Sequence, residues 1–225
     1  MSIFHSRAIV LHQLKYSDTS LIVKMYTPDY GMLSFIARGA RKARARIGSA
    51  LLQAGNLLEI QAYYKPTKEL QYLKEVHVCP HYDNIPFNVV KTAILLFYNE
   101  IAYKCIREQE ANPDLFEFLF QQYLKLDSYN ATMALLPLRF LWEFSSYLGL
   151  TPMDNYSRWN TFFDLREGRF SSVEPSHPDF IAYPLSNDFH QLLNGFHSNT
   201  FSPAYSSEKR FLLLETMLQF YQVHI

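Results

Sequence analysis

A change in hydrophobic periodicity at Pro80 is the strongest constraint on how this 225-residue chain can fold. Before Pro80, apolar side chains alternate with polar ones, as in residues 21–26, which is the pattern of a strand with one buried face. After Pro80, apolar residues recur every three or four positions, as on one face of a helix. The sequence therefore predicts an α+β protein, with a β domain over residues 1–80 and a mainly α-helical domain over residues 81–225.

The β domain is expected to hold five short strands. A turn at Pro28–Gly31 separates two of them, because proline presets φ and glycine accepts a positive φ. Five short strands in about 80 residues, with a long excursion between the third and the fourth, fit a five-stranded OB-fold barrel. An SH3-like barrel or a small sandwich would give the same number of strands. The strands are expected at about residues 4–14, 21–26, 33–37, 58–62 and 70–78.

Capping residues divide the helical domain. Asn112 and Pro113 form an N-cap followed by a proline at the first helical position, and Gly149 with Pro152 beyond it ends another helix. Residues 151–184 contain four prolines and are expected to form an irregular insertion. Helices are expected from about residue 86–88 onward, over 113–127, from 136 or through a kink at Pro137 to 149, near 185–193 and over 208–223.

The segment 38–46, RGARKARAR, carries five positive charges, and no Asp or Glu occurs between Tyr30 and Leu58. Residues 1–80 hold 11 Lys and Arg against 5 Asp and Glu, whereas the remaining residues hold 10 against 16. Such a cationic cluster suits a polyphosphate backbone, so we expect a basic, nucleic-acid-binding first domain. A solvated loop without an ordered target is the alternative. The expected contact residues are Arg38, Arg41, Lys42, Arg44 and Arg46, with Lys24 and Tyr26, on the outward side of the second strand, as weaker candidates in a base-stacking groove.

Sequence motifs for catalysis, cofactors and membranes are missing. The glycine-rich phosphate loops, the nucleophile elbow and the zinc-protease motif do not occur, so we predict neither a catalytic residue nor a cofactor. Two cysteines, Cys79 and Cys105, are too few for a disulfide framework or a four-cysteine zinc site. No apolar run approaches the roughly 18–20 residues of a membrane helix, and the N-terminus lacks a signal-peptide pattern. A cytoplasmic location is therefore expected.

Short motifs in both domains carry a family resemblance. The first domain contains Ala8–Leu11 (AIVL), Tyr16–Ser20 (YSDTS), and Arg38–Lys42 (RGARK) after a Tyr-Gly turn. The second domain contains Leu138–Pro152, with Leu-Arg-Phe at its start and Leu-Gly-Leu before its final Thr-Pro. In this order the motifs resemble the family of the bacterial DNA repair protein RecO, and the RGARK segment is the most specific of them.

The resemblance implies an OB-fold followed by a helical domain, in a non-enzymatic recombination mediator of the RecF pathway. Such a protein binds single- and double-stranded DNA and anneals complementary strands. With RecR, it helps load recombinase onto strands coated by single-strand-binding protein, in the cytoplasm at the nucleoid. The acidic helical domain would bind partners. A pocket formed by Leu138, Arg139 and Trp142 is expected to receive the C-terminal tail of single-strand-binding protein.

Many members of that family carry a four-cysteine zinc module after the central helix. The corresponding residues 151–184 contain no cysteine, so we predict a metal-free insertion that keeps the hairpin of the module within Phe162–Phe170. Three other functions stay open. The chain could be a non-catalytic adaptor whose barrel barely touches DNA, an RNA-binding OB-fold protein of translation or RNA turnover, or an enzyme whose site matches no known motif.

Overall fold

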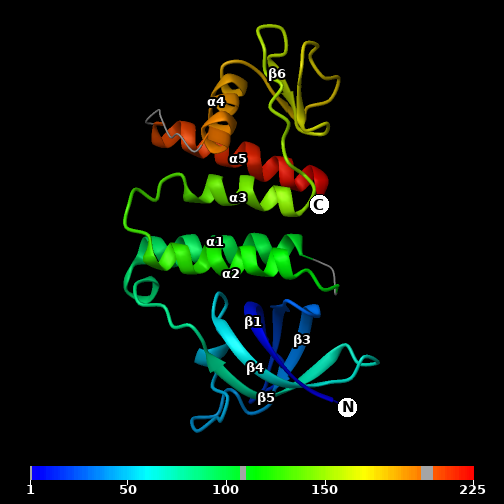
Figure 1. Cartoon of the computed structure of the whole chain (residues 1–225), viewed down its shortest axis with the longest axis vertical. Coiled ribbons are helices and arrows are strands. Elements are labelled where there is room, and N and C mark those ends of the chain that lie inside the picture. Colours follow the sequence, from blue (N-terminus) through cyan, green and yellow to red (C-terminus); the bar gives the residue numbers. More distant parts are fainter. Residues whose placement is uncertain (1, 107–109, 199–204) are drawn as a thin grey trace. The chain divides into compact units, whose positions relative to one another are not determined.

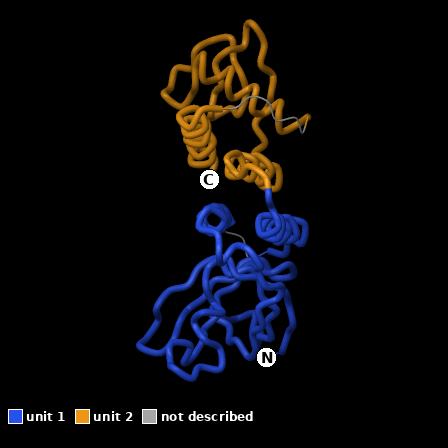
Figure 2. The backbone as a smooth tube through the Cα atoms, turned by 90° about the vertical axis from the view of Figure 1, so that its left-hand side faces the viewer, with its two compact units in different colours: residues 1–130 blue, residues 131–225 orange. Residues whose placement is uncertain are grey.

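The computed structural model describes residues 2–106, 110–198 and 205–225 (Figure 1). Contacts between Cα atoms divide the chain into two compact units, unit 1 with residues 1–130 and unit 2 with residues 131–225 (Figure 2). The expected division at residue 80 therefore falls inside unit 1, which combines the β domain with two helices. Among the described residues, no helix has the length and apolar character needed to span a bilayer.

Unit 1 begins with five strands that close into a barrel in the order β1-β2-β3-β5-β4, with β1 also paired to β4. β3 and β5 run parallel, and the other neighbouring strands run antiparallel. A closed five-stranded barrel of this kind is an OB-fold, so the predicted fold class is confirmed. The strands are β1 (Ser2–Lys15), β2 (Leu21–Thr27), β3 (Gly31–Ala37), β4 (Leu57–Tyr64) and β5 (Leu70–Val78).

The barrel interior is filled by the inward-facing side chains that the alternating pattern predicted, among them Val10, Val23 and Phe35. The excursion between β3 and β4 contributes to the same core. Ala40 and Leu52 are buried in it, and Leu52 ends the short 3-10 helix η1 (Ser49–Leu52). The excursion is therefore a folded part of the barrel.

A second apolar layer covers one outer face of the barrel. Ile9 and Leu11 alternate with the inward-facing Ala8 and Val10, yet they are fully buried. The helices α1 (Val89–Cys105) and α2 (Pro113–Ser128) supply the cover. Asn99 of α1 donates a hydrogen bond from its amide to the carbonyl oxygen of Leu11 at 2.7 Å. The first two helices are therefore packed onto the barrel.

A carboxylate clamp fixes the segment between β5 and α1, which includes the short helix η2 (Ile85–Phe87). The carboxylate of Asp127, near the end of α2, accepts hydrogen bonds from the backbone N–H groups of Asp83, Asn84 and Ile85 at 2.9, 2.9 and 2.7 Å. The buried Lys91 ammonium donates to the carbonyl oxygen of Asp127. Burial alone would raise the pKa of Asp127, but the three N–H donors and the charge of Lys91 outweigh it and lower that pKa.

Unit 2 packs three helices with a small three-stranded sheet of order β7-β6-β8. Its core is aromatic, since the rings of Phe163 and Phe189 have centroids 4.7 Å apart and Phe163 also meets Phe170 at 4.8 Å. The Tyr221 hydroxyl donates to the carbonyl oxygen of Leu141 at 2.6 Å and ties two helices together. The elements are α3 (Leu136–Tyr147), β6 (Phe162–Asp164), β7 (Arg169–Ser171), β8 (Phe180–Ile181), α4 (Leu185–Ser198) and α5 (Ser207–His224).

Candidate nucleic-acid interface

The basic loop, residues 38–46, leaves the barrel at the end of β3 and leads to η1. Gly39 has a φ of +72°, a conformation that glycine adopts without strain, and it turns the chain so that Ala40 enters the core. All five cationic residues of the loop are exposed, whereas Ala40 between them is buried. The loop thus presents cations outward from a backbone that is anchored inside the barrel.

Hydrogen bonds to the β1–β2 turn fix the loop further. The backbone N–H of Arg41 donates to the carbonyl oxygen of Thr19 at 3.1 Å. The Arg41 guanidinium donates to the carbonyl oxygens of Ser17 and Asp18 at 3.2 and 3.0 Å. At the other end, the N–H of Ser49 donates to the carbonyl oxygen of Ala40 at 3.0 Å. Arg41 therefore supports the loop as well as adding to its charge.

The other four cationic side chains of the basic loop differ in the contacts that they already make within the protein. Arg38 lies 4.9 Å from the ring centroid of Tyr72 and donates to its hydroxyl at 3.2 Å. Arg46 pairs with the Glu75 carboxylate at 2.8 Å, but its side chain is 75% exposed, so this ion pair is weak enough to exchange. Within the described part of the chain, neither Lys42 nor Arg44 makes an ion pair. These two offer the most accessible charge.

The predicted groove on the outward side of β2 is not open in the structure. Tyr26 is 1% exposed, because its ring lies against Phe116 of α2 with centroids 6.1 Å apart. The Lys24 ammonium lies 5.3 Å from the ring centroid of Tyr103 in α1. Helices therefore cover the face on which bases were expected to stack. Tyr26 therefore offers almost no surface to a base in this structure, whereas Lys24 is half-buried, and the contact of either residue with nucleic acid stays a prediction.

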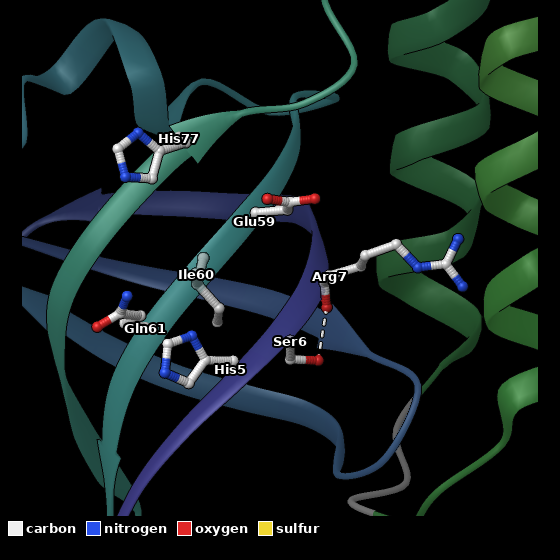
Figure 3. A pocket seen from close by; sticks show the side chains of 7 residues that line it. All are labelled: His5, Ser6, Arg7, Glu59, Ile60, Gln61 and His77. Atoms are coloured by element: carbon white, nitrogen blue, oxygen red, sulfur yellow. Dashed lines mark hydrogen bonds between the residues drawn. The ribbon is translucent and has the colours of Figure 1, made fainter.

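A shallow pocket of about 290 Å³ lies on another outer face of the barrel, across β1, β4 and β5 (Figure 3). Ser6 at its edge donates its hydroxyl proton to the carbonyl oxygen of Arg7 at 2.8 Å, so the hydroxyl is not paired with an imidazole as a nucleophile would be. The Arg7 guanidinium is held by Glu117 of α2 at 2.8 Å. No motif or periodicity indicated this pocket, which is lined by His5, Ser6, Arg7, Glu59, Ile60, Gln61 and His77.

The three residues predicted to bind a partner lie on α3 but not on one surface. Leu138 is 2% exposed and belongs to the interior, so it offers almost no surface to a partner, and its place in a tail-binding pocket stays a prediction. The Trp142 ring stacks on Phe196 of α4 with centroids 5.3 Å apart. Arg139 is partly exposed, and its Nε donates to the Glu143 carboxylate at 2.7 Å. Arg139 is the only one of the three that carries a charge, and its side chain is 38% exposed.

The insertion keeps the predicted hairpin, formed by β6 and β7. Side-chain hydrogen bonds hold the backbone of the hairpin. The Asp164 carboxylate accepts hydrogen bonds from the N–H groups of Arg166 and Glu167 at 2.8 and 3.1 Å. The Asn155 amide accepts from the N–H of Phe170 at 2.7 Å and donates to its carbonyl oxygen at 2.9 Å. Over residues 2–106, 110–198 and 205–225, no three His, Cys, Asp or Glu side chains are grouped to hold a metal ion.

An OB-fold barrel with an anchored cationic loop, followed by a helical region, defines the class of this α+β protein. Comparison with known families agrees with that architecture. Residues 1–82 match the family Recombination protein O N terminal, and residues 86–225 match Recombination protein O C terminal. The chain therefore belongs to the RecO family of DNA repair proteins.

Similar proteins from several bacteria cover nearly the whole chain. The DNA repair protein RecO of Bacteroides fragilis is 34% identical over 96% of this chain and 90% of its own length. The corresponding protein of Phocaeicola vulgatus is 30% identical over 96% of this chain and 90% of its own. That of Flavobacterium psychrophilum is 32% identical over 98% of this chain and 91% of its own.

Proposed function

We propose that this protein is a non-enzymatic mediator that binds single- and double-stranded DNA through the basic loop and anneals complementary strands. With RecR, it would help load recombinase onto strands coated by single-strand-binding protein. Annealing requires no catalytic group. It requires that two phosphate backbones approach each other while their charge is screened, and fixed surface cations supply that screening.

The observation that carries the proposal is the rigid display of charge on the basic loop. Its backbone is held by the buried Ala40 and by the hydrogen bonds of Arg41 to the β1–β2 turn, whereas Lys42 and Arg44 are exposed beside them. A fixed loop loses little conformational entropy when phosphates bind, so its cations are preorganised. Arg38 and Arg46 flank the pair, and the exposed ion pair of Arg46 leaves that side chain able to exchange partners.

The test is single-stranded DNA affinity over a salt series, measured by fluorescence anisotropy. The double variant Lys42→Ala/Arg44→Ala removes two charges without touching the hydrogen bonds of Arg41. Each lost phosphate contact should reduce the slope of log K against log salt by about 0.7, so the double variant should reduce it by about 1.4. The matched control Lys104→Ala/Lys125→Ala removes two exposed helical charges of unit 1 and should leave the slope unchanged.

An unchanged slope in the Lys42→Ala/Arg44→Ala variant, with wild-type affinity, would refute the basic-loop mechanism. Absence of DNA binding in the wild-type protein even at low salt would favour the adaptor function. Comparison of RNA and DNA of the same sequence addresses the RNA-binding alternative, since the 2′-hydroxyl distinguishes the two. Annealing itself is measured as the rate at which complementary oligonucleotides form duplex in the presence of each variant.

We further propose that Arg139 receives the acidic tail of single-strand-binding protein. Glu143 already pairs with Arg139, so a carboxylate from the tail would compete with it. The variant Glu143→Gln should therefore bind an acidic, Phe-ended peptide more tightly, and Arg139→Gln should bind it more weakly. Equal affinity of both variants and the wild type, by isothermal titration calorimetry, would rule Arg139 out.

A further inference from the structure

Unit 2 contains an exposed tryptophan that the proposed function does not use. Trp159 lies in the loop before β6 and is 69% exposed. The guanidinium carbon of its neighbour Arg158 lies 4.7 Å from the centroid of the Trp159 ring, in the geometry of a cation–π contact. The pair places a flat aromatic face and a positive charge side by side at the surface.

The loop that carries this pair is held by hydrogen bonds. The Ser157 hydroxyl oxygen accepts from the backbone N–H groups of Trp159 and Asn160 at 3.2 and 3.0 Å. Asn155, two residues before Ser157, is tied to β7 through both hydrogen bonds of its amide to Phe170. The Trp159 ring is therefore displayed from a hydrogen-bonded turn that Asn155 ties to β7.

Charge pairing singles out Arg158 within the described part of unit 2. Four other cations of the unit, Arg139, Arg166, Arg169 and Lys209, each pair with a carboxylate. Arg210 donates hydrogen bonds to oxygens of Tyr205 and Ser207. Among the described residues, no oxygen atom pairs with the Arg158 guanidinium. The pair thus combines an accessible aromatic face with an accessible positive charge.

We propose that Arg158 and Trp159 form a second contact site for single-stranded nucleic acid, on unit 2. An unpaired nucleotide has the matching chemistry, because its base offers a flat face for the indole and its phosphate a negative charge for the guanidinium. A duplex hides its base faces within the stack, so the site selects unpaired bases. The inference rests on the proposed DNA binding and extends it with a contact that reads the single-stranded state.

Tryptophan fluorescence tests this site directly, because the chain has only two tryptophans. The variant Trp142→Phe keeps an aromatic ring against Phe196 and leaves Trp159 as the only indole. Titration with oligothymidylate should quench its emission over the same concentrations at which the anisotropy of the labelled oligonucleotide rises. In the control variant Trp159→Phe, the emission of Trp142 should stay constant over that titration.

Affinity measurements separate stacking from charge. The variant Trp159→Ala should bind oligothymidylate on the order of tenfold more weakly, the cost of one lost base stack. For an abasic oligomer of the same length, Trp159→Ala and the wild type should have equal affinity, because such an oligomer keeps its phosphates but has no bases to stack. Arg158→Ala should weaken binding to both oligomers and reduce the salt slope by about 0.7.

The outcomes distinguish this site from the proposed function. A rise in anisotropy without any change in Trp159 emission or any loss of affinity in Trp159→Ala would overturn the second site and leave DNA binding by the basic loop intact. No rise in anisotropy at low salt would overturn both. A change in Trp159 emission only with an acidic peptide, and not with oligothymidylate, would identify a protein-docking surface and overturn the nucleic-acid site.

Discussion

The carboxylate clamp at Asp127 gives the sharpest stability prediction. In Asp127→Ala the N–H groups of Asp83, Asn84 and Ile85 lose their acceptor, and the buried Lys91 loses the nearby negative charge. Hydrogen bonds to a charged group each contribute about 1.5–3 kcal/mol, and removing one partner of a buried charged network costs about 3–5 kcal/mol. We expect Asp127→Ala to lower the free energy of unfolding of unit 1 by about 4 kcal/mol, a large share of the total of an ordinary domain.

Asp127→Asn should cost about half as much. Its remaining oxygen can still accept from Asn84 and Ile85, which share Oδ1, but the new amide group would point a donor at the N–H of Asp83. The exposed neighbour Asp83 supplies the matched control, because Asp83→Asn removes one negative charge and leaves its backbone N–H in place. That variant should change stability by less than about 0.5 kcal/mol.

Urea unfolding followed by far-ultraviolet circular dichroism measures these differences, with hydrogen exchange of the α1 amides to assign them to unit 1. Tryptophan fluorescence would not suffice, since both tryptophans, Trp142 and Trp159, lie in unit 2. A cost below about 1 kcal/mol for Asp127→Ala would show that water replaces the carboxylate at no loss, and would refute the clamp. A cost equal to that of Asp83→Asn would do the same.

The clamp also predicts a pH dependence. Because the pKa of Asp127 is lower in the folded than in the unfolded protein, its ionised form stabilises the fold. This contribution should be complete above the unfolded pKa of about 3.9 and should disappear as the pH falls through the lowered folded value. The stability difference between the wild type and Asp127→Asn should therefore shrink below about pH 4. A difference that stays constant down to pH 2, about two units below the ordinary pKa, would contradict the assignment.

Three further substitutions test other contacts. Gly55→Ala should destabilise unit 1 by about 1–3 kcal/mol in thermal unfolding, because Gly55 has a φ of +88° and a Cβ there would lie 2.9 Å from a methyl carbon of Leu95. Asn155→Ala should lower the free energy of unfolding of unit 2 by about 1–3 kcal/mol, read from tryptophan emission, because both backbone groups of Phe170 lose their partner. Tyr26→Phe should leave DNA affinity unchanged and cost less than about 0.5 kcal/mol, because the hydrogen bond from its hydroxyl to the carbonyl oxygen of Asn112 is long, at 3.4 Å.

The barrel could be predicted because apolar and polar side chains alternate along its strands, and this alternation shows which side of a strand faces the core. At Tyr26 the outward face of β2 is covered by α2, so a side chain that points out of the barrel is not always exposed to solvent. One signal was present: Ala8–Leu11 is a continuous apolar run, which indicates a strand buried on both faces. That run marks the strand on which α1 packs.

The helical part was predicted less completely, because an apolar face on a helix does not show which element of the fold packs against it. In α1 the apolar Val90 is 52% exposed, whereas the buried face includes the polar Lys91 and Asn99. Polar side chains are buried in a core where they find a hydrogen-bond acceptor or donor. For Lys91 and Asn99 the acceptors are the carbonyl oxygens of Asp127 and Leu11. Those partners are remote in sequence. The same limit placed Leu138 at a surface, although it lies in the interior.

The apolar layer on the outside of the barrel has a practical consequence for dissecting the protein. A fragment cut after residue 80 would retain all five strands but would expose Ile9, Leu11 and Tyr26 to solvent. An exposed apolar patch on a small β-barrel promotes self-association, so such a fragment should aggregate or bind nonspecifically in pull-down experiments. Expression of residues 1–130 keeps that surface covered, and a soluble fragment for mapping nucleic-acid contacts should end there.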